Sequence, residues 1–269
     1  MSKNKEIENN ILDIIKQKYE INSSIRLRVS TMVECLSDEN QINKLDNVVD
    51  WFETKVEECP FEVEQIPLDD VKGWYKAEHT GNIVHESKGF FSIIGVRTFT
   101  NIREVSGSGW DQPMVDQGTK SSLVGILRKN INDFPHYLLE AKAEPGNWGT
   151  LQLSPTLQAT FSNLHTAHKG NKPNYAEYFE ENTGEELEYS DCLNKGNQGK
   201  YNLLYRQWLP EDGGRFFKKR VLFKLVEVDE SERVKVLDNF IWITLFQIKE
   251  LLKRDNIVNP HVRSIIAHL

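Results

Sequence analysis

The chain has 269 residues, of which 39% are hydrophobic, so it is long enough to bury a substantial core. Its 40 acidic and 33 basic residues give a formal net charge of -7, which excludes a general electrostatic attraction to nucleic acid or to anionic membranes. The sequence has no apolar run near the roughly 20 residues of a membrane span, and it starts without the apolar core of a signal peptide. We therefore expect a cytoplasmic protein whose partners include neither nucleic acid nor membrane.

Residues 1–59 are predicted to form an N-terminal helical segment. Apolar side chains recur there at helical spacing in three stretches, within 7–15, 25–36 and 42–56. Cys59 and Pro60 end the pattern, because proline lacks a backbone donor and disfavours helix at the residue before it. We expect two or three amphipathic helices, followed by a separate domain over residues 60–269.

Beyond Pro60 the pattern is that of strands. Short runs rich in aromatic and β-branched residues, bounded by Gly, Pro, Asn or Asp, occupy 89–99, 136–143, 150–154 and 216–228. Helical spacing returns at 244–254, and Ser154 and Pro155 favour a short helix that begins near residue 156. We expect an α+β fold with a mixed, mainly antiparallel sheet and flanking helices.

Hydrogen-bonding side chains are concentrated between residues 141 and 160. Lys142 and Glu144 lie two apart at the end of a predicted strand, and Gln152 and Ser154 repeat that spacing on the next one, so the four converge if the strands pair. One explanation of this pattern is a sheet face that is exposed to solvent and carries an ion pair. However, such faces are usually rich in Lys and Glu, whereas Gln, Ser, Thr and Asn suit a polyhydroxylated or heterocyclic ligand.

Residues in two predicted loops have either a structural role or a ligand-binding role. In "SGWDQP" (108–113), Trp110 is either a core side chain or a platform on which a base or sugar ring stacks. In "PEDGGRFF" (210–217), the two glycines permit a tight hairpin turn, and Arg215 has the planar fork that suits phosphate oxygens.

Cysteine and histidine spacings give no metal site. Cys35, Cys59 and Cys192 are too few and too scattered for disulfides or thiolate ligation, so we expect reduced thiols. His165 and His168 alone are close enough to share a helical face, and further clustered ligands are lacking.

Several motifs, in order along the chain, resemble the sugar-nucleotide 2,3-dehydratase family, which opens the route to 2,6-dideoxysugars. The central ones are "AKAEPGN", "QLSPTLQAT" and the His168/Gly170 pair. The others are "IPLDDVKGW" (66–74), "GNIVHESKGFFSIIGV" (81–96), "WDQP" (110–113), Tyr175 and Phe179, "EDGGRF" (211–216), "WITLFQI" (242–248) and "DNIVN" (255–259). The resemblance covers residues 51–269.

The resemblance implies a Nudix-like scaffold without the Nudix catalytic box. Family members typically carry two such repeats in tandem, whereas this chain carries one, so a homodimer is expected in place of the tandem. The family's second repeat also usually shows an Asn-Arg-Tyr run where this chain has Val221, Leu222 and Phe223.

The implied reaction removes water across carbons 2 and 3 of a dTDP-4-keto-6-deoxyhexose, without a cofactor or metal. Its product, a 2,6-dideoxy-3,4-diketo sugar nucleotide, implies a downstream 3-ketoreductase as a partner. We assign acid/base work and enolate stabilisation to Lys142 and Glu144, with His85, His168 and Tyr175 as competing bases. The expected substrate-binding residues are Arg103, Trp110, Gln112, Asn147, Gln152, Ser154, Gln158, Thr160, His168, Glu211 and Arg215.

Two other interpretations stay open from the sequence. The chain is a non-catalytic nucleotide-sugar binding protein that partners a true dehydratase, or it is a scaffold whose function depends on helices in residues 1–58. Loss of the 2-hydroxyl from the sugar separates an enzyme from a binder.

Overall fold

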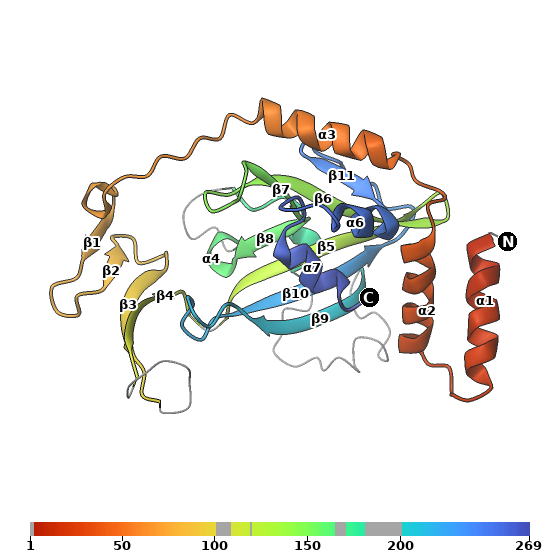
Figure 1. The fold of residues 1–269 in the computed structure, drawn as a ribbon, viewed down its shortest axis with the longest axis horizontal. Coiled ribbons are helices and arrows are strands. Elements are labelled where there is room, and N and C mark those ends of the chain that lie inside the picture. The colour runs from red at the N-terminus through yellow and green to blue at the C-terminus, as the bar shows by residue number, and fades with distance from the viewer. Residues whose placement is uncertain (1–2, 101–108, 119, 165–170, 181–200) are drawn as a thin grey trace.

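The computed structural model describes residues 3–100, 109–118, 120–164, 171–180 and 201–269. The predicted N-terminal helices are confirmed as α1 (Lys3–Lys16), α2 (Ser23–Leu36) and α3 (Leu45–Glu58). Asn22 caps α2 by accepting a hydrogen bond from the Ile25 amide, and α3 ends just before Cys59 and Pro60, as expected. In Figure 1, α1 and α2 form a pair at one end of the molecule, and α3 lies along the large sheet.

A small antiparallel sheet stands at the opposite end from α1 and α2 (Figure 1). It contains β1 (Trp74–Lys76), β2 (Ile83–His85), β3 (Ser92–Arg97) and β4 (Asp111–Asp116), in that order. The sheet joins the body of the protein through β4. Val115 bridges to Phe216, and the Gln112 side-chain amide donates to the carbonyl oxygen of Gly214 at 2.7 Å.

The large sheet is mixed and mainly antiparallel, as predicted. Its strands are β5 (Lys120–Ile131), β6 (Phe134–Ala143), β7 (Leu151–Pro155), β8 (Leu157–Thr160), β9 (Asn202–Pro210), β10 (Arg220–Val228) and β11 (Phe240–Ile243). The order is β11-β6-β5-β10-β9, with β7 paired to β6 and β8 paired to β5. Among these strands β5 and β10 run parallel, and the other pairs are antiparallel.

The β5–β6 hairpin is tight at its turn and opens at its far end. Asn132 and Asp133 both have positive φ, at 53° and 62°, which suits a two-residue turn whose twist matches that of the strands. Beyond the Leu127–Leu138 pair the two strands diverge, and β7 and β8 fill the space between them.

Thr156 lies where the two strands diverge. Its Oγ1 accepts a hydrogen bond from the Leu127 amide at 2.8 Å and donates one to the Leu138 carbonyl. These bonds satisfy one backbone group on each strand after direct pairing ends.

The prediction of a helix that begins near residue 156 is wrong. Residues 157–160 form β8, and helix α4 covers only Phe161–Leu164. The physical reason is strand pairing with β5, which matches Leu157 with Gly125 and Ala159 with Leu123. This tertiary pairing overrides the local capping signals at Ser154 and Pro155.

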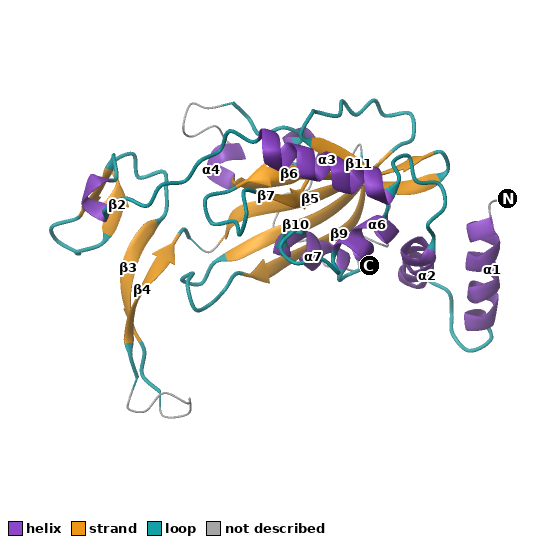
Figure 2. Cartoon of the chain, turned by 45° about the horizontal axis from the view of Figure 1, so that its top comes forward, coloured by secondary structure: helices purple, strands orange, loops and turns teal. Residues whose placement is uncertain are grey.

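Helices α6 (Leu245–Leu251) and α7 (Pro260–Ile266) cover one face of the large sheet together with α3 (Figure 2). The α6 N-terminus is a capping box of Thr244 and Gln247, which confirms the helix predicted over 244–254. At α7, Asn259 is the cap and Pro260 the first helical residue. A second apolar core lies on the other face, around Leu123, Leu138, Phe179 and Trp242.

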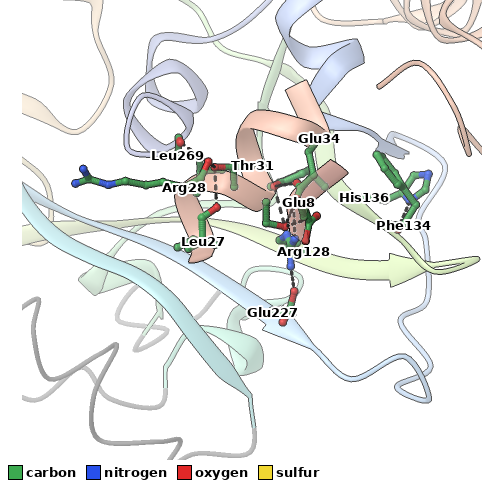
Figure 3. Close-up of polar contacts among 12 residues, drawn as sticks. Glu8, Leu27, Arg28, Thr31, Glu34, Arg128, Phe134, His136, Glu227 and Leu269 are labelled. Carbon is green, nitrogen blue, oxygen red and sulfur yellow. Dashed lines mark hydrogen bonds and ion pairs between the residues drawn. The ribbon is translucent and has the colours of Figure 1, made fainter. Parts of the chain in front are cut away.

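A buried charged network holds α2 against the sheet (Figure 3). The Glu34 carboxylate accepts from Arg128 at 2.6 Å and from the Tyr137 hydroxyl at 2.7 Å, and Arg128 also pairs with Glu227. Only 2% of the Glu34 side chain and 8% of the Arg128 side chain are exposed. Burial and the Glu34 charge raise the pKa of Tyr137 well above its usual value, so its hydroxyl remains a donor.

In the part of the chain that the structure describes, every helix is too short or too polar to cross a bilayer.

Candidate functional site

A cavity of about 270 Å³ lies beside the diverging strands, between the end of β6, β8, the β9–β10 connection and α7. Five side chains singled out in the sequence line it, namely Lys142, Glu144, Gln158, Thr160 and Glu211. Seven other residues complete the lining, which are Ser122, Val124, Ala159, Asn163, Lys219, Val221 and His261. The volume is near the lower end of the roughly 300–1,000 Å³ range of small-molecule sites.

The first polar cluster joins β6 to β8. Lys142 Nζ lies 3.5 Å from Glu144 Oε1 and donates to the Gln158 carbonyl at 3.3 Å, while the Gln158 side-chain amide donates to the same Glu144 oxygen at 2.9 Å. The side-chain oxygen of Gln158 is buried without a hydrogen-bond partner among the described residues. The cavity therefore presents an oriented ion pair, which the Gln158 side-chain amide holds through its bond to Glu144.

The second polar cluster joins the β9–β10 connection to α7. Glu211 Oε1 lies 3.5 Å from His261 Nε2 and 3.8 Å from Lys219 Nζ. The interaction with His261, reinforced by Lys219, lowers the pKa of Glu211, and burial lowers the pKa of Lys219. Nδ1 of His261 is buried without a hydrogen-bond partner in the described part of the chain. This cluster therefore combines an ionised carboxylate with an imidazole that has one unpaired nitrogen.

Strands β6 and β7 pair as the polar stretch suggested. Lys142 lies opposite Gln152, which accepts a hydrogen bond from the Asn259 side chain at 3.1 Å. Ser154 is fully buried opposite Glu140. Asn147 donates to the Lys142 carbonyl at 3.1 Å and so holds the β6–β7 connection. In this structure Gln152, Ser154 and Asn147 support the cavity wall and do not line it.

His85 and Tyr175, which were predicted as candidate catalytic bases, lie away from the cavity. His85, on β2, packs against Trp74 and Phe90 at ring-centroid distances of 5.4 and 4.5 Å, and its Nδ1 lies 2.8 Å from the Ser87 hydroxyl. The Tyr175 hydroxyl donates to the Lys235 carbonyl at 2.7 Å within the second core. Neither residue lines the cavity.

The residues predicted to contact the nucleotide base and the diphosphate also lie outside the cavity lining. Trp110 donates to the Gln112 side chain at 2.6 Å, so the two are joined at the start of β4. Arg215 is 80% exposed and pairs with Asp212 at 2.8 Å in the hairpin connection. Arg103 and His168, like His165 and Cys192, lie outside the described residues.

Sequence reasoning missed Lys219, His261 and Glu140. The first two meet Glu211 only in three dimensions, although His261 follows the "DNIVN" motif by two residues. Glu140 lies on the same strand face as Lys142, and burial raises its pKa to about 7, with Glu144 adding to the rise. Its position two residues before Lys142 was the available signal, because alternate strand residues share a face.

Comparison with known proteins gives one consistent family. The family model described as NDP-hexose 2,3-dehydratase matches residues 45–269. Three curated proteins named dTDP-4-dehydro-6-deoxy-alpha-D-glucopyranose 2,3-dehydratase are similar. The protein from Saccharopolyspora spinosa is 36% identical over 217 residues, which cover 81% of this chain and 40% of that protein.

The other two relatives agree. The protein from Streptomyces violaceoruber is 34% identical over 220 residues, covering 81% of this chain and 45% of the relative. The protein from Amycolatopsis orientalis is 34% identical over 230 residues, which cover 84% of this chain and 45% of that protein. The chain thus spans less than half the length of these relatives. A crystal structure of C. elegans Ap4A hydrolase aligns with a TM-score of 0.30 and 14% identity, over 55% of this chain and 96% of that one.

Proposed function

Because the chain belongs to the NDP-hexose 2,3-dehydratase family, we propose that it is a carbon–oxygen lyase acting on a dTDP-4-keto-6-deoxyhexose. The reaction removes water across carbons 2 and 3 and gives a 2,6-dideoxy-3,4-diketo sugar nucleotide. The three curated relatives carry names for this activity on the glucose-derived substrate.

The observation that carries the proposal is the cavity with its two charged clusters, which lies wholly within the residues that the family model matches. Its volume suits the hexose and is too small for the complete sugar nucleotide, so the nucleotide would extend outside it. A larger hollow of about 900 Å³ at the α1–α2 turn is lined only by residues 9–26, all of which precede the family match.

The chemistry starts with proton removal beside a carbonyl. The hydrogen on carbon 3 is acidic only because the ketone at carbon 4 can take up the negative charge. An enzyme for this reaction needs a base near carbon 3, a positive group or hydrogen-bond donor near the carbon-4 oxygen, and an acid for the poor leaving group on carbon 2.

Lys142 and Glu144 fit the second and third of these needs. The Lys142 ammonium is a donor for the enolate oxygen, and the Lys142–Glu144 pair can supply the proton with which the 2-hydroxyl leaves as water. Gln158 and Thr160, which also line the cavity, are proposed to bind sugar hydroxyls. Trp110 and Gln112 with thymine or hexose, and Arg103 and Arg215 with the diphosphate, stay predictions.

Partner and fold details are also part of the proposal. The relatives are more than twice as long as the region they share with this chain, and a symmetric pair of chains would supply a comparable mass. We propose a Nudix-like scaffold, a homodimer, and consumption of the diketone by a downstream 3-ketoreductase. A cytoplasmic location and the boundary between residues 59 and 60 stay predictions from the sequence.

The test is incubation of the purified chain with dTDP-4-keto-6-deoxyglucose, followed by mass spectrometry and NMR. We expect loss of one water and disappearance of the hydroxyl on carbon 2. Saturable binding of the intact sugar nucleotide without that loss would identify a binding protein and overturn the lyase assignment. Light scattering of the same sample reports whether the chain is dimeric.

A further inference from the structure

The two charged clusters of the cavity come from opposite sides of strand β5. Lys142 belongs to β6, and its Nζ donates to the Gln158 carbonyl on β8, which pairs with β5. Lys219 directly precedes β10, which pairs with β5 along its other edge. Two strand spacings, about 10 Å, therefore separate β8 from β10. A hexose in the cavity would meet a different cluster at each of its ends.

Lys219 is a largely buried cation without a hydrogen bond. It lines the cavity with 9% of its side chain exposed, and its Nζ lies 4.6 Å from the centroid of the Phe216 ring. The nearest carboxylate oxygen in the described part of the chain is Glu211 Oε1 at 3.8 Å, beyond hydrogen-bond distance. Burial lowers the pKa of Lys219 although Glu211 acts in the opposite direction, so Glu211 compensates this charge only in part. An ammonium with three donors in this position suits a ligand oxygen.

The chain around Lys219 also carries an excess of positive charge. Residues 211–220 contain four cations against two carboxylates, namely Arg215, Lys218, Lys219 and Arg220 against Glu211 and Asp212. At the other side of the cavity, residues 140–144 contain one cation, Lys142, and two carboxyl groups. An anionic part of a ligand is therefore attracted to the side that the β9–β10 connection forms.

The proposed substrate differs in charge between its two ends. Its ketone is on carbon 4, and its diphosphate is attached through carbon 1, at the opposite end of the pyranose ring. With the carbon-4 oxygen at Lys142, as proposed above, carbon 1 and its phosphate point toward Lys219. The phosphate supplies the negative charge that Lys219 lacks, and the nucleotide then extends out of the cavity on the same side.

We propose that Lys219 binds the phosphate group attached to carbon 1 and thereby sets the direction in which the sugar nucleotide enters the cavity. This inference rests on the proposed dehydratase function and deepens it. Lys219 is a binding residue in this arrangement and takes no part in proton transfer. The sequence pointed to Arg103 and Arg215 for the diphosphate, but Arg215 is 80% exposed and pairs with Asp212.

The test compares the wild-type chain with Lys219→Met and with the control Lys253→Met. Lys253 also pairs with a glutamate, Glu250, but 69% of its side chain is exposed. Calorimetry measures the binding of dTDP and of thymidine, which has no phosphate, and steady-state kinetics follows dTDP-4-keto-6-deoxyglucose. We expect Lys219→Met to weaken dTDP binding and to raise KM by about tenfold or more, because a charge-assisted contact is lost. The change in kcat should be much smaller, and thymidine binding and Lys253→Met should match wild type.

Two further variants test the charge itself. Lys219→Arg keeps a cation whose planar fork suits phosphate oxygens, whereas Lys219→Gln keeps a polar side chain without the charge. We expect the Arg variant to bind dTDP more tightly than the Gln variant. If Lys219→Met melts early, this comparison decides, at a temperature where both variants are folded. Equal affinity of the two for dTDP would show that Lys219 serves the fold alone and would overturn the proposal.

The outcomes separate the two levels of inference. Dehydration by wild type together with unchanged dTDP binding and KM in Lys219→Met overturns the role of Lys219 and leaves the proposed function in place. Binding of dTDP that depends on Lys219, without dehydration by wild type, overturns the lyase assignment and leaves the phosphate site in place. A wild-type chain that neither dehydrates the sugar nucleotide nor binds dTDP overturns both.

Discussion

The ammonium of Lys142 lies 3.5 Å from the carboxylate of Glu144, and Gln158 donates to the same carboxylate oxygen at 2.9 Å. With 22% and 31% of their side chains exposed, the two charged groups are only partly screened by water. An ion pair held in this way can orient a donor toward a substrate oxygen at little entropic cost.

If Lys142 acts as proposed, replacing it with Met should lower kcat by about 100-fold or more, because the variant loses the donor that is proposed to stabilise charge on the carbon-4 oxygen. The apolar stem is retained, so the melting temperature should change little. Lys72→Met, at an exposed position before β1, is the matched control. Steady-state kinetics on the two variants checks this, and undiminished dehydration by Lys142→Met would remove the residue from the mechanism.

Glu140 should make the protein less stable as pH rises. Burial raises its pKa from 4.5 to about 7 in the folded chain, so between these values the folded state holds a proton that the unfolded state has lost. Stability is therefore greatest below pH 4.5, as far as this group is concerned, and declines until about pH 7. At about 1.4 kcal/mol per pKa unit, the total loss is about 3 kcal/mol.

Glu140→Gln should abolish that decline, because the amide is neutral throughout. The variant should exceed wild type in unfolding free energy at pH 8 and match it near pH 5. Urea denaturation at the two values measures the difference, with the exposed Glu64→Gln as control. An equal gain at both pH values would show that the effect is packing and not ionisation.

Thr156→Val should destabilise the fold although the two side chains have nearly the same shape. The change leaves the Leu127 amide and the Leu138 carbonyl without their partner at the point where β5 and β6 separate. Two unsatisfied buried groups cost about 2 kcal/mol or more. Thr156→Ser keeps the hydroxyl and should cost less in the same urea experiment; the opposite order would argue that the methyl group matters more.

Glu34→Ala should destabilise the protein by about 3 kcal/mol, because Arg128 then stays buried with Glu227 as its remaining carboxylate. A triple variant, Glu34→Leu with Arg128→Met and Glu227→Gln, should recover much of the loss, since it leaves no uncompensated charge. Thermal unfolding of the three proteins checks this. Because α2 precedes the family match, kcat measured well below the melting temperature should not change.

Local patterns in the sequence were enough to predict two or three N-terminal helices, of which three form, the strands at 89–99 and 136–143, and the helix that begins after Thr244. Each is specified by spacing within a few turns or by a cap. The strand period also predicted that Lys142 and Gln152 would share a face if their strands paired, and the two strands do pair.

The features that the sequence did not reveal depend on contacts between distant residues. Strand β8 forms because it pairs with β5, which local helix signals at Ser154 and Pro155 do not include. His261 and Lys219 reach Glu211 only when α7 packs against the sheet. His85 had a suitable side chain for a base, but the sequence does not show that its ring packs among aromatic residues in the small sheet.

The cavity also has a kinetic consequence for folding, because its walls come from β5, β6, β8, the β9–β10 connection and α7. These segments are far apart in the sequence, so the contacts between them give the cavity a high contact order. Their formation is slow, because the long loops between the segments must close first. During refolding from denaturant, far-ultraviolet helical signal from α1–α3 should therefore return before catalytic turnover, and turnover should recover only when the last segment has docked.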